Sequence, residues 1–342
     1  MSLPSSPSRR LTIADVAQAA GVSRTTVSHA LNDRGQVDPE TRARIKEIAA
    51  RLGYSPNLRA QRLRTGRANS IALLSSMPFA VAGGPSRLGF LMEIAATATE
   101  AALRQGLALV LVPPLDGAQS LLDSLDIDGA VIIEPVADDP QVERLRKRGV
   151  ALVSIGRQPE MNPPLAYVDL HGKEAGQLLL EHLHEQGARR IGLLIGSQSR
   201  HSYLDMEAAY RDFCAASVQQ PIIERADEAG GEAAGMTACL RMLDAHPQLD
   251  GLCVPVDAFA VGAVQALQQR KRRIPEDVKV VTRYDGLRAR QCEPPLTALN
   301  LHLEQIAAQA IDLLFEQING DSGRLRVAAP LATLVPRAST KA

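Results

Sequence analysis

Residues 11–32, which read LTIADVAQAAGVSRTTVSHALN, predict two short helices joined by a tight turn. Thr12 and Asp15 stand in capping-box positions at the start of the first helix, and Gly21 suits the left-handed residue that ends it. Ser23 caps the second helix, whose apolar positions are Val27, Ala30 and Leu31. The two helices are therefore expected to pack through their apolar faces, with the polar face of the second left in solvent.

A third helix follows at residues 38–52. Asp38-Pro39-Glu40 is a strong start, because it combines a cap, a proline in the first turn and an acid at the positive end of the helix dipole. The apolar positions Ile45, Ile48, Ala49 and Leu52 repeat with helical spacing, and Gly53 ends the run. Two helices around a glycine-containing turn, with a third to complete the core, predict a helix-turn-helix domain.

The outward positions of the second helix suit contact with DNA bases. They are Arg24, Thr25, Ser28 and His29. Arginine and histidine donate hydrogen bonds to base edges, while small hydroxyl side chains permit a close approach. Charge supports this interpretation, since residues 1–67 hold 12 basic and 5 acidic side chains, whereas the rest of the chain holds 26 and 33. A basic head on an acidic body predicts a polyanionic partner at one end only.

The head resembles that of the LacI/GalR-type bacterial transcription regulators. The resemblance lies in residues 11–32, in VDPETRARI (37–45) and in LGYSPNLRAQRL (52–63). It implies that Arg24, Thr25 and His29 meet bases in the major groove. It also implies a hinge helix in the minor groove over residues 57–63, with Leu63 as an intercalating wedge. From the residues themselves, Asn57 can cap this helix and the small Ala60 allows close contact. Residues 58–65 make under three helical turns, too few to be stable alone in water, so we expect this helix to need DNA and a second copy.

From Ser70 onward, apolar strands alternate with helices, which predicts parallel sheets covered on both faces. The expected strands are residues 70–75, 107–112, 129–133, 151–155, 190–196, 250–255 and 277–282. About 270 residues exceed one comfortable core, so two α/β lobes are expected. The resulting division is a flexible tail (1–8), a helix-turn-helix headpiece (9–56), a hinge and linker (57–68), and a two-lobed effector-binding domain (69–342). Lobe 1 is placed at about 69–167 and 298–326, and lobe 2 at about 168–297 and 327–340.

The body is also similar to that family, whose effector domain is like type I periplasmic binding proteins. By resemblance, the effector contacts are Arg200, Asp257, Asp285 and Asn300, with an aromatic wall from Phe79 or Phe259. Ala209 stands where the family usually has an arginine, and either Arg200 or Arg211 is the candidate substitute. The chain has no tryptophan and 3% aromatic residues, which gives little support for stacking on a neutral sugar. The expected ligand is a small polar metabolite, a sugar or sugar derivative, and a small polar or anionic sugar derivative is preferred.

The expected function is therefore a DNA-binding regulator, a repressor, that binds a palindromic operator as a homodimer and responds to a small molecule between the lobes. An α/β sugar-processing enzyme with a fused DNA-binding head is the alternative, and a purely architectural DNA-bending protein is a third. No Walker loop, G-x-S-x-G elbow or H-E-x-x-H motif occurs, so no catalytic residue, metal or cofactor is expected. The four cysteines lack metal-type spacing and no apolar run suits a membrane helix, so a cytoplasmic protein is expected.

Overall fold

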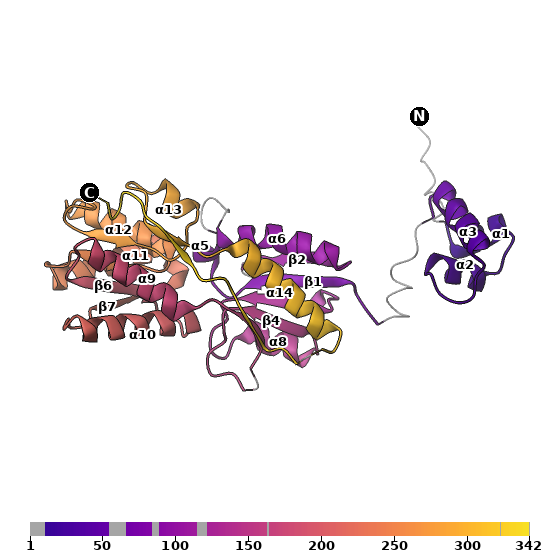
Figure 1. The fold of residues 1–342 in the computed structure, drawn as a ribbon, viewed down its shortest axis with the longest axis horizontal. Coiled ribbons are helices and arrows are strands. Elements are labelled where there is room, and N and C mark those ends of the chain that lie inside the picture. Colours follow the sequence, from indigo (N-terminus) through magenta and orange to yellow (C-terminus); the bar gives the residue numbers. More distant parts are fainter. Residues whose placement is uncertain are drawn as a thin grey trace, which may run out of the picture. The chain divides into compact units, whose positions relative to one another are not determined.

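The computed structural model describes residues 11–54, 66–83, 89–114, 122–162, 164–321 and 323–341. The chain divides into two compact units, Met1–Ala68 and Asn69–Ala342, which we call the head and the body (Figure 1). The expected tail (1–8) and the hinge residues Asn57, Ala60 and Leu63 lie outside the described residues. The expected fold class, a helix-turn-helix domain followed by a two-lobed α/β domain, is confirmed.

The head consists of three helices, α1 (Ile13–Ala20), α2 (Arg24–Leu31) and α3 (Pro39–Leu52). Each begins at the predicted cap: the Thr12 amide donates to Asp15 at 2.7 Å, Ser23 accepts from the Thr26 amide at 3.0 Å, and Asp38 accepts from the Thr41 amide at 3.0 Å. Gly21 and Gly53 adopt left-handed conformations, with φ of 65° and 70°, at the ends of α1 and α3. The core contains Val16, Ala17, Ala20, Val27, Ala30, Ile45, Ile48 and Ala49.

Lobe 1 of the body is built on a six-stranded parallel sheet with the order β11-β5-β4-β3-β1-β2. Its strands are β1 (Ser70–Ser75), β2 (Ala108–Val112), β3 (Gly129–Ile133), β4 (Ala151–Ile155), β5 (Ala166–Asp169) and β11 (Arg326–Ala328). The helices α6 (Phe90–Arg104) and α14 (Leu303–Ile318) pack side by side, and α14 crosses β4 (Figure 1). The helix α8 (Pro140–Lys147) contributes Val142 and Leu145 to a separate apolar cluster. Both faces of this sheet are therefore covered.

Lobe 2 has a four-stranded parallel sheet with the order β7-β6-β8-β9. Its strands are β6 (Ile191–Gly196), β7 (Ile223–Ala226), β8 (Gly251–Cys253) and β9 (Lys279–Val281). Its helices are α9 (Gly172–Glu185), α10 (His201–Ala216), α11 (Gly231–Ala245) and α12 (Asp257–Gln269). α9 packs on α10, and α11 packs on α12 so closely that a Cβ at Gly262 would lie 2.1 Å from the Glu232 carbonyl oxygen.

The remaining elements lie where the chain passes between the lobes or near that border. They are α5 (Phe79–Ala82), the 3₁₀ turn η1 (Glu228–Gly230), α13 (Leu287–Gln291), and the antiparallel pair β10 (Ala298–Asn300) and β12 (Thr333–Val335). The borders expected at 167/168 and 326/327 fall inside β5 and β11, because these two strands stay paired in lobe 1 as far as Asp169 and Ala328. In the described part of the chain, no helix combines the length and apolarity needed to cross a membrane.

Candidate functional site

The exposed face of α2 carries the residues predicted to read DNA. Arg24, Thr25 and His29 are exposed and Ser28 is half-buried, whereas Val27 and Ala30 on the other face are buried in the head core. All four polar residues thus lie on the solvent side of one short helix. Because the Ser23 cap and the packing against α3 fix that helix, these side chains project from a rigid element.

The loop after α2 is tied to the rest of the head. Gly35 has a φ of 65°, and a Cβ there would lie 2.6 Å from Nδ1 of His29, so the loop backbone passes directly beside the His29 ring. Asp33 accepts from Arg42 at 3.0 Å and from Lys46 at 2.7 Å, and these two hydrogen bonds lower the pKa of its carboxyl. The loop therefore holds one side of the predicted DNA-reading surface in place.

The body contains a cavity of about 80 Å³ between its lobes, at the carboxyl ends of the parallel strands. Lobe 1 contributes Glu134, which follows β3, together with apolar side chains such as Phe90 and Ile133. Lobe 2 contributes Asp257 at the start of α12, and Arg283 and Tyr284 after β9. This edge of a parallel sheet is where ligands bind in open α/β folds.

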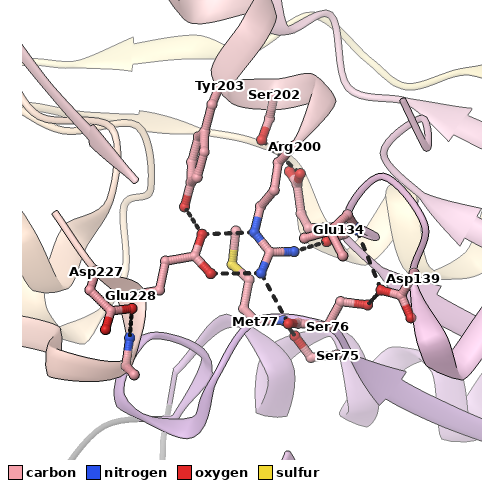
Figure 2. A network of polar contacts seen from close by, with 12 residues as sticks. Ser75, Ser76, Met77, Glu134, Asp139, Arg200, Ser202, Tyr203, Asp227 and Glu228 are labelled. Carbon is pink, nitrogen blue, oxygen red and sulfur yellow. Dashed lines mark hydrogen bonds and ion pairs between the residues drawn. The ribbon is translucent and has the colours of Figure 1, made fainter. Parts of the chain in front are cut away.

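A buried network around Arg200 joins the two lobes beside this cavity (Figure 2). Arg200, 1% exposed, donates from Nε and Nη2 to the two carboxylate oxygens of Glu228 at 2.7 and 2.6 Å. It also donates to two lobe 1 carbonyls, to Ser76 at 3.0 Å and to Glu134. Burial opposes the charge of Arg200, but the hydrogen bond and charge of Glu228 outweigh it and raise the arginine's pKa. Arg200 is thus fully occupied in holding the lobes together.

Glu134 forms a second bridge between the lobes. Its carboxylate accepts from Arg283 at 3.1 Å and from the Ser202 hydroxyl at 2.7 Å, and both donors belong to lobe 2. Its backbone has a φ of 52°, a left-handed conformation that a residue with a Cβ adopts at a cost of about 1–3 kcal/mol. Such strain is typical of functional sites, where the surrounding structure holds an unfavourable conformation in place.

Two residues that line the cavity carry three buried donor atoms with no hydrogen-bond partner among the described residues. These atoms are Nε and Nη2 of Arg283 and the hydroxyl of Tyr284. Arg283 is 9% exposed and Tyr284 is 8% exposed, and both line the cavity. Burial is the main cause that raises the pKa of the Tyr284 hydroxyl, and nearby Glu93 adds to it, so this group stays protonated at neutral pH. Unused buried donors are costly, and they mark a place where a ligand or water is accommodated.

Asp257 is held by lobe 2 and helps to connect the lobes through Arg288. Its carboxylate accepts from the Ala258 amide at 2.7 Å and from Arg288 at 3.3 Å. Arg288 reaches in turn to the carbonyls of Ala80 and Val81 in lobe 1, at 2.5 and 2.9 Å. Burial raises the pKa of Asp257 and Arg288 opposes that rise.

The residues predicted to contact the effector do not all meet in this cavity. Asp257 lines it, while Arg200 lies buried beside it. Asp285 and Asn300 line a different cavity of about 500 Å³, where Asp285 accepts from Arg337 at 2.6 Å. Phe79 lines a third hollow of about 400 Å³ beside Arg288, and Phe259 is fully buried in the body core.

The two candidate substitutes for the arginine expected at Ala209 are both occupied elsewhere. Ala209 is buried where α10 packs on α9, so this position faces a helix and not the cavity. Arg211 is largely exposed and pairs with Glu207 at 2.7 Å. Sequence reasoning missed Glu134, Arg283 and Tyr284, although each lies within two residues of the end of a predicted strand. In the part of the chain that the structure describes, no group of three His, Cys, Asp or Glu side chains is placed to hold a metal ion.

Comparisons with known proteins agree with this architecture. Residues 12–57 match the model of the bacterial regulatory proteins of the lacI family, and residues 180–340 match a periplasmic binding protein-like domain. The HTH-type transcriptional regulator CelR of Thermobifida fusca is 30% identical over 92% of this chain and 94% of its own length. The HTH-type transcriptional repressor PurR of Pasteurella multocida (strain Pm70) is 27% identical over 96% of this chain and 98% of its own.

Solved structures resemble this chain over nearly its whole length. A lac repressor dimer bound to operator and the anti-inducer ONPF superposes with a TM-score of 0.79 at 25% identity, covering 98% of this chain and 100% of that one. A CelR–cellobiose complex superposes with a TM-score of 0.70 at 27% identity, covering 96% and 100%. Because these regulators are similar to it over both the head and the body, the chain belongs to the LacI family of bacterial regulatory proteins.

Proposed function

We propose that this protein is a cytoplasmic transcriptional repressor that binds a palindromic operator as a homodimer and is controlled by a small molecule bound between its lobes. The observation that carries the proposal is the exposed face of α2, where Arg24, Thr25 and His29 project from a capped, packed helix. A relative bound to operator DNA is a dimer, which supports the assignment of two half-sites.

Affinity for DNA is expected to come from the whole head, whereas sequence preference comes from α2. One recognition helix spans only a few base pairs, so useful specificity requires two heads on an inverted repeat. We assign base contacts to Arg24, Thr25, Ser28 and His29. From the sequence alone, we assign minor-groove contacts to Asn57, Ala60 and Leu63. Leu63→Ala should then lower operator affinity and reduce DNA bending, with little change in ligand affinity.

For the effector, we propose the cavity between the lobes as the site. Of the five residues predicted from sequence, Asp257 lies in this cavity, and Glu134, Arg283 and Tyr284 join it there. Arg200 acts beside the site as a connection between the lobes, while Asp285, Asn300 and Phe79 line separate hollows. Both lobes contribute residues to the walls of the cavity, so a bound molecule can favour one arrangement of the lobes over another.

The ligand then controls DNA binding because ligand binding and operator binding are thermodynamically linked through the state of the body. A ligand changes operator affinity only through its different affinities for the two states of the body, and such couplings are typically about 1–3 kcal/mol. A regulator needs no turnover of the ligand. Incubation of the protein with any ligand it binds, followed by chromatography, tests the enzyme alternative: an unchanged ligand supports the regulator, and product formation supports the enzyme.

The DNA-binding part is tested by selection from a random double-stranded library with the full-length protein. We expect an inverted repeat to be enriched, and Arg24→Ala to weaken the preference at one position of each half-site. The matched control is Arg51→Ala, which removes an exposed arginine at the end of α3 and leaves α2 intact. Recovery of no sequence motif by the unmodified protein would contradict the proposal.

A further inference from the structure

We infer that the effector is a compact, uncharged ring compound that presents a carbonyl oxygen to Arg283, and neither an oligosaccharide nor a carboxylate. The inference rests on the proposed function, since it assumes that the cavity between the lobes is the effector site. It is carried by the size of the cavity, the nature of its walls, its unused donors and its balance of charge.

Size is the first restriction. The cavity of about 80 Å³ is far below the roughly 300–1,000 Å³ of ordinary small-molecule sites, and closer to the roughly 150 Å³ that holds benzene. Its walls are tied together by the protein's own bonds across the lobes. Arg200 donates to the Ser76 carbonyl at 3.0 Å, Arg283 to Glu134 at 3.1 Å, and Arg288 to the Val81 carbonyl at 2.9 Å. With these contacts intact, the space excludes a molecule larger than about one ring.

The walls are mainly apolar. Ile94 and Ile133 line the cavity together with Phe90, whose ring meets that of Tyr284 edge-to-face at a centroid distance of 6.1 Å. A molecule with hydroxyl groups on every side would leave several of them against these walls without hydrogen bonds, which is unfavourable. The body of the ligand is therefore expected to be apolar, with its polar atoms gathered on one side.

The polar atoms that remain free in the cavity are donors. Nε and Nη2 of Arg283 and the Tyr284 hydroxyl have no partner among the described residues. By contrast, both carboxylate oxygens of Glu134 already accept hydrogen bonds, one from Arg283 and one from Ser202. Asp257 likewise accepts from Arg288 and from the Ala258 amide. A ligand that satisfies these free donors supplies acceptor oxygens, and a carbonyl oxygen can accept two hydrogen bonds.

The balance of buried charges at the cavity favours a ligand with a neutral carbonyl over one with a carboxylate. Each buried cation at the cavity is already paired: Arg200 with Glu228, Arg283 with Glu134 and Arg288 with Asp257. A carboxylate ligand would be buried close to Glu134 and Asp257 with no further cation to balance it. Burying an uncompensated charge is strongly unfavourable, whereas a neutral carbonyl uses the free donors without adding charge.

The test is a thermal-shift series on the full-length protein with matched probes at about 10 mM. The uncharged ring carbonyls are δ-valerolactam, cyclohexanone and benzamide, and the comparison compounds are benzoate, glucose and cellobiose. We expect at least one ring carbonyl to raise Tm by about 2–4 °C and the comparison compounds to leave it unchanged. The inference is overturned if benzoate, glucose or cellobiose gives the larger shift, or if none of the three ring carbonyls gives any.

Variants of the protein test whether the rise in Tm depends on Arg283. Arg283→Met should abolish it, and the surface control Arg211→Met should keep it in full. Tyr284→Phe removes one hydroxyl without loss of the ring, and it should reduce the shift even if Arg283→Met fails to fold. If Arg283→Met folds and still shows the full Tm shift, the inference is contradicted. If Arg283→Met does not fold, a full Tm shift in Tyr284→Phe contradicts it. If cellobiose raises Tm and also changes operator affinity, the proposed function stands and only the inferred ligand class fails.

Discussion

Arg200 and Glu228 form a two-point ion pair that is almost completely buried, with Nε–Oε1 and Nη2–Oε2 distances of 2.7 and 2.6 Å. The Tyr203 hydroxyl donates to the same carboxylate at 2.6 Å, and the arginine also reaches two carbonyls of lobe 1. Every polar atom of this pair therefore has a partner, and the pair links the sheets of the two lobes.

Glu228→Gln should strongly destabilise the body. Glutamine keeps the size of the side chain but leaves the Arg200 charge buried without its counter-ion, and breaking such a pair costs about 3–5 kcal/mol. The free energy of unfolding from urea titrations of the full-length protein measures this loss. Glu100→Gln is the matched control, because its pair with Arg104 is exposed and should contribute less than about 1 kcal/mol. Equal small losses in both variants would contradict the structural role of the buried pair.

Arg24→Ala should reduce operator affinity by about 1–3 kcal/mol and relax the preference at one base position. The physical reason is that a base contact supplies both affinity and discrimination, whereas a phosphate contact supplies affinity alone. Fluorescence anisotropy on a panel of single-base variants of the selected operator distinguishes the two. A uniform loss over the whole panel would show that Arg24 contacts a phosphate.

Operator binding should weaken steeply with salt. Residues 1–67 hold 12 basic and 5 acidic side chains, although the chain as a whole has no net charge. A dimer that touches about 6–10 phosphates loses about 10³–10⁵ in affinity between 50 and 200 mM salt. The dissociation constant measured at four salt concentrations gives the slope. Specific binding that does not depend on salt would contradict the electrostatic part of this account.

The four cysteines should react slowly with a thiol reagent at pH 8 in the folded protein. Burial raises the pKa of Cys239 and of Cys253 to about 12 and that of Cys292 to about 11, and it also raises the pKa of Cys214. At pH 8 these thiols are then neutral, and the reactive form is the thiolate. Ellman's reagent should therefore label all four in urea and almost none without it. Rapid labelling of the folded protein would show that the body opens readily.

Local features of the fold were predictable from the sequence because short-range chemistry decides them. Thr12, Ser23 and Asp38 cap their helices as expected, and the apolar runs at 70–75, 129–133 and 151–155 coincide with β1, β3 and β4. β7 was missed, because its four residues include Glu224 and Arg225 and it lies at the edge of its sheet.

The site was harder to predict because it depends on contacts between distant segments. Arg200 follows a strand and carries a charge, so it was expected to contact the effector, but nothing local shows that it meets Glu228. Asp285 and Arg283 lie on the same loop, two residues apart, and only the path of that loop directs Arg283 into the cavity while Asp285 pairs with Arg337. Sequence patterns located the edge of the sheet, but they did not determine which side chain faces inward.

The central claim is that one chain couples a DNA-reading head to a ligand-binding body. The most direct test measures the affinity of the full-length protein for its selected operator with and without a saturating amount of whichever compound raises the Tm of the protein. The account predicts a change of about 5–150-fold in the dissociation constant, in either direction. An unchanged dissociation constant, in the presence of a compound that still raises Tm, would contradict it.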